Sequence, residues 1–144
     1  YESCLIKKKI VEKDEKENNL RKVLNLGHTF AHAYESTLNY SKKLNHGEAV
    51  IIGIKKAIKL SHHYNLLSKN KLEIITKHIN KIDTIKRLEK LFNKKQINKI
   101  IYFMKSDKKN KSEKINLILI KDFGKIKTDF HIDPKKLKNY LYNS

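Results

Sequence analysis

Several residue types are scarce in this chain, and each shortage excludes a class of protein. The 144 residues include one cysteine, one proline, four glycines and no tryptophan. Because Cys4 stands alone, no disulfide can form within the chain, and a cytoplasmic location is the simpler expectation. So few glycines leave no predicted strand followed by a glycine-rich turn, which is the sequence signature of a dinucleotide-binding domain.

Long hydrophobic runs are missing as well. Runs such as Ala49 to Ile54 fall far short of the roughly 18 apolar residues that a membrane-spanning helix needs, so we expect no membrane partner. A hydrophobic fraction of 39% is enough for one core, and we expect a single domain over residues 1–144. The sequence starts at Tyr1, inside a predicted helix, so we expect a piece of a longer polypeptide.

Arginine is nearly absent, although the net charge is +18. Of the 33 basic residues only Arg21 and Arg87 are arginine, and the lysines are scattered over every segment among asparagine and isoleucine. Nucleic-acid readout favours arginine and exposed aromatic residues beside the charge. We therefore expect no nucleic-acid partner, and the arginine retained at position 21 becomes more informative.

The residues that are present predict a mainly α fold. Hydrophobic spacing predicts helices over residues 3–12, from Asn18 or Asn19 to about 38, 46–65, 69–78, 84–93 and 97–104. Alternating residues around the turn at Asp122–Gly124 predict a small β-hairpin near residues 115–130. A last helix is predicted from Pro134 to about 142, with Asp133 as its cap.

Four polar residues share one face of the second predicted helix: Arg21, Asn25, His28 and His32. Their spacings of four, three and four residues keep them within a narrow arc. His46 follows at the start of the next predicted helix. The pattern is typical of a lined site and not of a solvated face.

His28 and His32 are four residues apart, as are the two histidines of many zinc-binding helices. Thr29 stands where the hydrolytic His-Glu-x-x-His motif has its acidic base, so we do not expect a zinc hydrolase of that type. His28 and His46 would supply two nitrogen ligands, and catalytic zinc normally takes three protein ligands. Glu35, Glu48 or a residue outside this sequence are candidates for the third.

The surrounding residues suit a particular substrate chemistry. Gly47 beside His46 would let a neighbouring helix or ligand approach closely. Arg21 and Asn25 supply a cation and an amide for an anionic, hydroxylated substrate. A helical histidine taken alone is more often a partly buried structural residue, and we assign no role to the remaining four, which are His62, His63, His78 and His131.

Two long strings in the sequence resemble the 3-dehydroquinate synthase family. They are Asn25-Leu-Gly-His-Thr-Phe-Ala-His32 and His46-Gly-Glu-Ala-Val50. The similarity continues through Cys4-Leu-Ile-Lys7, Asp107-Lys-Lys109 and Leu117 to Gly124. It implies the mostly helical C-terminal half of that fold, which binds metal and substrate.

The resemblance also implies an activity. Enzymes of this family are NAD- and metal-dependent carbon–oxygen lyases of the shikimate pathway, which leads to chorismate and the aromatic amino acids. They convert 3-deoxy-D-arabino-heptulosonate 7-phosphate to 3-dehydroquinate with release of phosphate. NAD would be bound by an N-terminal domain that this chain lacks, so we expect no cofactor-binding residues here and an incomplete site. The full-length family members commonly form homodimers.

Roles for individual residues follow from the same resemblance. His28 and His46 would bind the metal, zinc or cobalt, and His32 would take part in proton transfer at the substrate. Arg21, Asn25 and Lys7 match substrate-binding positions, and either Lys108 or Lys109 would contact the anionic part of the substrate. Two alternatives stay open: a sister sugar-phosphate cyclase that makes another cyclitol, and a non-catalytic helical metal-binding module.

Overall fold

Helices account for most of the chain, which confirms the predicted fold class. The computed structural model describes residues 1–17, 20–82, 84–106 and 113–144. The helices are α1 (Glu2–Lys13), the 3-10 helix η1 (Leu20–Asn25), α2 (His28–Thr37), α3 (His46–His63), α4 (Lys69–Ile79), α5 (Ile85–Glu89), the 3-10 helix η2 (Lys94–Gln96), α6 (Ile97–Ser106) and α7 (Pro134–Asn143). Two strands, β1 (Ile115–Asp122) and β2 (Lys125–Ile132), form an antiparallel hairpin.

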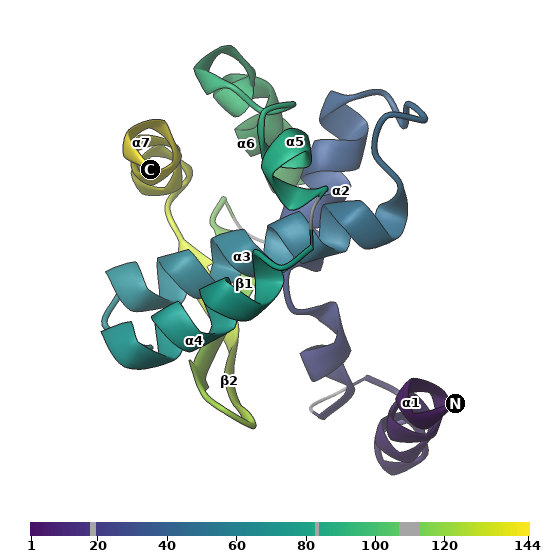
Figure 1. Cartoon of the computed structure of the whole chain (residues 1–144). Coiled ribbons are helices and arrows are strands. Elements are labelled where there is room, and N and C mark those ends of the chain that lie inside the picture. The colour runs from purple at the N-terminus through teal and green to yellow at the C-terminus, as the bar shows by residue number, and fades with distance from the viewer. Residues whose placement is uncertain (18–19, 83, 107–112) are drawn as a thin grey trace.

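Helix α3 is the central element, and α2, α4, α5 and β1 all pack against it (Figure 1). Its start is defined by a capping box, in which the side chain of Asn45 accepts from the amide of Glu48 and the Glu48 carboxylate accepts from the amide of Asn45. Its end comes where Asn65 takes a left-handed φ of 56°. The start and end predicted from the sequence are confirmed.

The hydrophobic core lies between α2, α3, α6 and the inner face of the hairpin. Its largest fully buried apolar side chains come from these elements and from α5 and α7: Phe30, Tyr34, Ile52, Leu60, Ile85, Leu88, Met104, Ile115, Leu117, Leu119 and Leu137. Alternate residues of β1 are buried, as expected for a strand with one face on the core. The hairpin turns at Gly124, whose φ is +69°.

A buried serine joins the hairpin to α3. The Ser61 hydroxyl donates to the carbonyl oxygen of Ala57 at 2.8 Å and accepts from the amide of Ile120 at 3.0 Å. At the other end of the hairpin, Asp133 caps α7 by accepting from the amides of Lys135 and Lys136. The predicted Asp133 cap is therefore confirmed.

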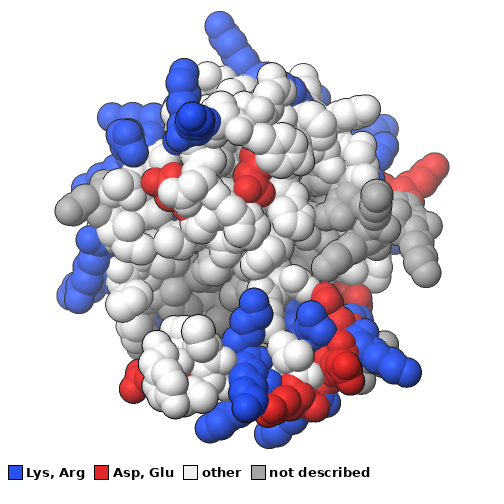
Figure 2. Space-filling model, turned by 90° about the vertical axis from the view of Figure 1, so that its right-hand side faces the viewer, with Lys and Arg blue, Asp and Glu red and all other residues white. Residues whose placement is uncertain are grey.

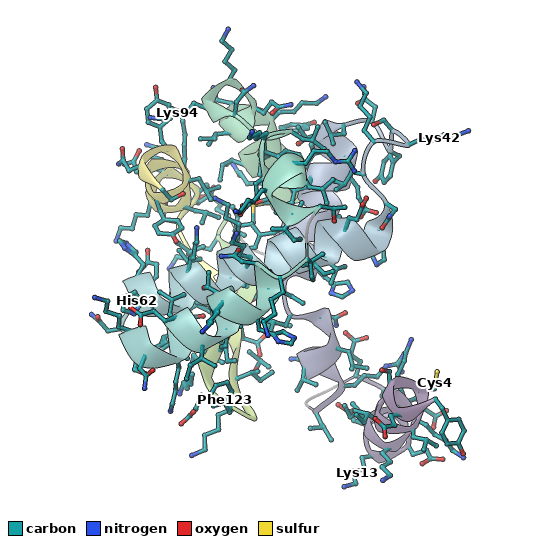
Figure 3. The ribbon with its side chains drawn as sticks, viewed as in Figure 1. Cys4, Lys13, Lys42, His62, Lys94 and Phe123 are labelled. Atoms are coloured by element: carbon teal, nitrogen blue, oxygen red, sulfur yellow. The ribbon has the colours of Figure 1, made fainter. Side chains whose placement is uncertain are left out.

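Helix α1 projects from the rest of the molecule, beside η1 (Figure 1). None of its residues is buried, and Cys4 lies exposed on it (Figure 3). Figure 3 also shows Lys42 pointing outward from the segment between α2 and α3, and Phe123 at the tip of the hairpin. No helix in the described ranges has the length and apolar content for crossing a membrane.

Lysine is spread widely over the surface. On the face shown in Figure 2, lysine and arginine side chains gather toward the edges, and uncharged side chains occupy most of the middle. The charge of +18 is therefore not concentrated at the centre of this face.

The single helix predicted from Asn18 or Asn19 to about residue 38 is wrong. The structure has η1 over Leu20–Asn25 and a separate helix α2 from His28, with Gly27 between them at a left-handed φ of +79°. The physical reason is tertiary, because the backbone at Gly27 packs against α3 and leaves the helical path to do so. The candidate caps Asn18 and Asn19 lie outside the described residues. The predicted helix over 84–93 is confirmed only for Ile85–Glu89.

Candidate functional site

Three imidazole rings gather where α2 and α3 begin. His28 and His46 are the first residues of their helices, and His32 lies one turn further along α2. The ring centroids are 5.6 Å apart for His28 and His46, 5.8 Å for His28 and His32, and 6.1 Å for His32 and His46. The predicted grouping of these histidines is present in the structure.

A close backbone contact sets the relative position of the two helices. A β-carbon added to Gly53 would lie 2.2 Å from the carbonyl oxygen of Gly27, and one added to Gly27 would lie 2.4 Å from the amide nitrogen of Ile54. No side chain fits at either position. The close approach of a neighbouring helix that we expected at Gly47 is made by this pair instead, because among the described residues a β-carbon at Gly47 would meet the Asn45 side chain at 3.5 Å. The expected approach of a ligand at Gly47 stays a prediction.

The two acidic residues proposed as further ligands have different surroundings. Glu35, on α2, has a carboxylate oxygen 3.1 Å from Nδ1 of His46, and its side chain is only 13% exposed. Glu48 closes the capping box of α3 with Asn45. The structure thus gives Glu48 a local role at the start of α3 and places the Glu35 carboxylate in contact with Nδ1 of His46.

Arg21 and Asn25 lie on η1 and contact the segment that follows α1. The Arg21 guanidinium donates to the carbonyl oxygen of Glu15 at 2.7 Å, and its amide donates to the Asp14 carboxylate at 2.9 Å. The Asn25 amide donates to the Glu17 carboxylate. The expectation that Arg21 and Asn25 share one helix face with the histidines is wrong, because Gly27 separates η1 from α2.

Of the lysines predicted to bind substrate, the structure describes Lys7. Lys7 is exposed on α1, the helix that packs against η1. Lys108 and Lys109 lie outside the described residues. The structure therefore places Lys7 on α1 beside η1, and not on either of the helices that carry the imidazoles.

An open depression adjoins the imidazoles, with a volume of about 510 Å³. Besides His32, Glu35 and His46, it is lined by four residues that the sequence did not indicate: Ser36, Tyr40, Phe103 and Ser106. The Ser36 and Tyr40 hydroxyls are 3.0 Å apart. Ser36 lies near the end of α2 and Tyr40 follows the helix, so helical spacing in the sequence does not link them to this surface.

A second cavity, of about 280 Å³, has an entirely different lining. Tyr34, Ile52, Phe92 and Leu141 give it apolar walls, and Lys56 also lines it. Burial raises the pKa of the Tyr34 hydroxyl and lowers the pKa of the Lys56 ammonium. Because no lining residue is shared with the depression beside the imidazoles, we do not assign this cavity to the site.

Comparison with known proteins identifies the family of the chain. Residues 1–110 match the family model described as 3-dehydroquinate synthase C-terminal. The chain belongs to this family. Its relatives include the 3-dehydroquinate synthase of Pelagibacter ubique, which is 48% identical over 141 residues, covering 98% of this chain and 38% of that protein. The 3-dehydroquinate synthase of Coxiella burnetii is 40% identical over 139 residues, covering 96% of this chain and again 38% of the relative.

A solved structure confirms the fold of the 3-dehydroquinate synthase C-terminal family for this chain. It is the crystal structure of 2-deoxy-scyllo-inosose synthase complexed with carbaglucose-6-phosphate, NAD+ and Co2+. Its TM-score is 0.72 at 21% sequence identity, over 90% of this chain and 36% of that one. The chain thus spans a little over a third of the length of the proteins it matches.

The donor set of this family member fits part of a metal site. Two imidazoles bound to one tetrahedral zinc, with Zn–N distances of about 2.0–2.1 Å, have ring centroids roughly 5 Å apart. The 5.6 Å between His28 and His46 is close to that value. Within the described ranges, however, no three His, Cys, Asp or Glu side chains are placed to hold one metal ion. The fit therefore extends to two ligands.

Proposed function

We propose that this chain is the C-terminal metal- and substrate-binding part of a 3-dehydroquinate synthase. The reaction is the conversion of 3-deoxy-D-arabino-heptulosonate 7-phosphate to 3-dehydroquinate with release of phosphate, in the shikimate pathway of the cytoplasm. One observation carries the proposal: in a chain of this family, His28, His32 and His46 meet at the starts of two helices held together by their backbones. Identity of 48% to a protein named for this activity supports the same choice.

His28 and His46 hold the divalent metal ion, zinc or cobalt, in this proposal. When bound, the metal acidifies a substrate hydroxyl beside it. Both imidazoles must be neutral on the nitrogen that faces the ion. Cobalt in the solved 2-deoxy-scyllo-inosose synthase supports a divalent metal for the fold, and imidazole suits both metals.

His32 moves a proton at the substrate. Its ring lies 5.8 Å from His28 and 6.1 Å from His46, so a substrate held at the metal comes within reach of it. A histidine is suited to this role because its ordinary pKa lies near neutral pH. It also lines the open depression, which gives substrate a route to the ring.

Arg21, Asn25 and Lys7 bind the anionic groups of the substrate, together with Lys108 or Lys109. In the structure the Arg21 guanidinium donates to a carbonyl oxygen and the Asn25 amide donates to a carboxylate. These bonds show donors directed at acceptor oxygens, and substrate carboxylate or phosphate oxygens would replace those acceptors. Ionic hydrogen bonds of this kind are the stronger ones.

The remainder of the active site belongs to another part of the native protein. We propose that a dinucleotide-binding domain on its N-terminal side binds NAD and supplies the third metal ligand, and that the native protein is a homodimer. NAD+ in the solved 2-deoxy-scyllo-inosose synthase supports the cofactor, and its sugar-phosphate analogue supports the substrate class.

Phosphate release by the native protein, with the seven-carbon sugar phosphate, NAD+ and Co2+, tests the proposal. We expect the wild-type protein to release phosphate. We expect His28→Ala and His46→Ala to lose both this activity and Co2+ binding. The variant His62→Ala is the matched control, since its Nδ1 lies 2.8 Å from the Leu67 carbonyl oxygen, away from the imidazole group. Full activity in His28→Ala would contradict the assignment.

A sister sugar-phosphate cyclase is the second candidate, because the structural neighbour is one. Its sequence identity of 21% is well below the 48% to the Pelagibacter 3-dehydroquinate synthase. The same assay with glucose 6-phosphate as substrate separates the two. Turnover of glucose 6-phosphate in place of the seven-carbon substrate would favour the sister enzyme.

A further inference from the structure

Glu35 and His46 form a contact between α2 and α3 beside the imidazole group. Glu35 Oε1 lies 3.1 Å from Nδ1 of His46. The Glu35 side chain is 13% exposed, whereas the His46 side chain is 57% exposed. A largely buried carboxylate therefore holds an imidazole that is itself more than half exposed.

This contact determines which nitrogen of His46 is available. A carboxylate is an acceptor, so the neutral His46 ring donates from Nδ1–H and keeps its lone pair on Nε2. Metal-binding histidines usually have such a partner on the nitrogen that does not bind the metal, and the partner fixes both tautomer and ring orientation. Glu35 is such a partner for His46, the more exposed of the two proposed metal ligands.

The position of the bond explains why it is needed. His46 is the first residue of α3, where its ring has few neighbours to restrict it, and His28 is held 5.6 Å away on α2. Because Glu35 also lies on α2, the bond ties His46 to the helix that carries the other proposed ligand. Glu48, the acidic residue nearest in sequence, is already used in the cap of α3.

We infer that Glu35 is a positioning residue and not itself a metal ligand. Its bond to Nδ1 of His46 orients the ring so that Nε2 can bind the metal. The inference rests on the proposed function, because it assigns Nε2 of His46 to the metal. It also assigns a task to one of the two carboxylates that the sequence left as candidate ligands.

The first test needs no metal. The tautomer of His46 is measured by 15N NMR in the metal-free native protein, with His46→Ala to assign the signals. We expect the Nδ1–H form in wild type and a shift toward the Nε2–H form in Glu35→Ala. An unchanged tautomer in Glu35→Ala would overturn the inference.

The second test is the affinity for Co2+, measured by titration calorimetry. We expect about 10–100-fold weaker binding in Glu35→Ala, the usual effect of removing such a partner. Glu35→Gln keeps an acceptor oxygen, and we expect it to fall between wild type and Glu35→Ala. Glu73→Ala, which removes an exposed carboxylate from α4, is the control and should bind as wild type.

Three outcomes would count against the inference, and they are distinguishable. Wild-type affinity in Glu35→Ala, with binding lost in His46→Ala, overturns the role of Glu35 and leaves the proposed metal pair intact. Complete loss in Glu35→Ala, as in His46→Ala, makes Glu35 a ligand and overturns the positioning role. Wild-type affinity in both His28→Ala and His46→Ala overturns the metal pair and the inference together.

Discussion

Gly27 and Gly53 touch through their backbones, at the point where α2 begins and α3 passes its midpoint. A β-carbon on Gly53 would lie 2.2 Å from the Gly27 carbonyl oxygen, a distance that real β-carbons essentially never show. The atom it would meet belongs to the backbone and not to a flexible side chain. The relative position of the two helices, and so of the three imidazoles, depends on this contact.

The first prediction concerns that contact. Gly53→Ala forces α2 and α3 apart, and we expect a loss of about 3 kcal/mol in unfolding free energy, the upper end for overpacking. Urea denaturation measures it. Gly47→Ala is the matched control on the same helix, because its β-carbon would have room, and it should be neutral or slightly stabilising. Equal stability of the two variants would contradict the contact.

The second prediction concerns Ser61, which is fully buried. Ser61→Ala leaves the amide of Ile120 in β1 without its acceptor, and an unsatisfied buried donor costs about 1–3 kcal/mol. The control is Ser106→Ala, since Ser106 makes the same hydroxyl-to-carbonyl bond one turn back, to Tyr102, at an exposed position. Thermal unfolding should show a clear loss of stability for Ser61→Ala and none for Ser106→Ala.

The third prediction concerns the buried ammonium of Lys55. It donates to the Asn80 side chain and to the Glu89 carboxylate, both at 2.9 Å, and Lys55 is 5% exposed. Glu89→Ala leaves this charge without its counter-ion, and we expect a loss of about 3 kcal/mol. The double variant Lys55→Met with Glu89→Leu removes both charges and should be more stable than Glu89→Ala. A double variant no better than the single one would show that burial of the charge is not the cause.

The fourth prediction concerns pH. The hydrogen bond from Asn116, and after it the one from Lys22, hold the pKa of the Asp129 carboxyl below its usual range. The folded state therefore binds this proton less readily than the unfolded state. Its stabilising contribution is present above about pH 4, the ordinary pKa of an aspartate, and is lost as the pH falls through the lower folded value.

Asp129→Asn tests that dependence, because asparagine also tolerates the left-handed φ of 57° at this position. We expect the unfolding free energy of the variant to fall less steeply than that of wild type below pH 4. Glu73→Gln, on the exposed side of α4, controls for the loss of one carboxylate. Parallel slopes for wild type and Asp129→Asn would contradict the prediction.

Local patterns in the sequence predicted much of this fold. The span of α3, the hairpin and the Asp133 cap are all confirmed, because hydrophobic period, turn residues and capping residues act over a few positions. The break at Gly27 was missed for the opposite reason. Its cause is Gly53, 26 residues further along, and the polar spacing on either side of Gly27 is compatible with an unbroken helix.

The site was predictable to a similar degree. The meeting of His28, His32 and His46 followed from their spacing and from the two strings that carry them. The bond from His46 to Glu35 could not be predicted from the sequence, because it depends on the path of the connection between α2 and α3. Asn39 and Tyr40 turn that connection with left-handed φ values of 52° and 53°, which local sequence preference does not specify.

The break at Gly27 divides the polar run into two separately anchored pieces. Arg21 and Asn25 are held by the residues that follow α1, whereas His28 and His32 are held by α3. In the proposed function, a substitution ahead of Gly27 therefore alters binding of the anionic substrate while the imidazole geometry stays fixed. These proposed roles give engineering of substrate preference a starting point in the first 26 residues, and engineering of the proposed metal site a separate one in α2 and α3.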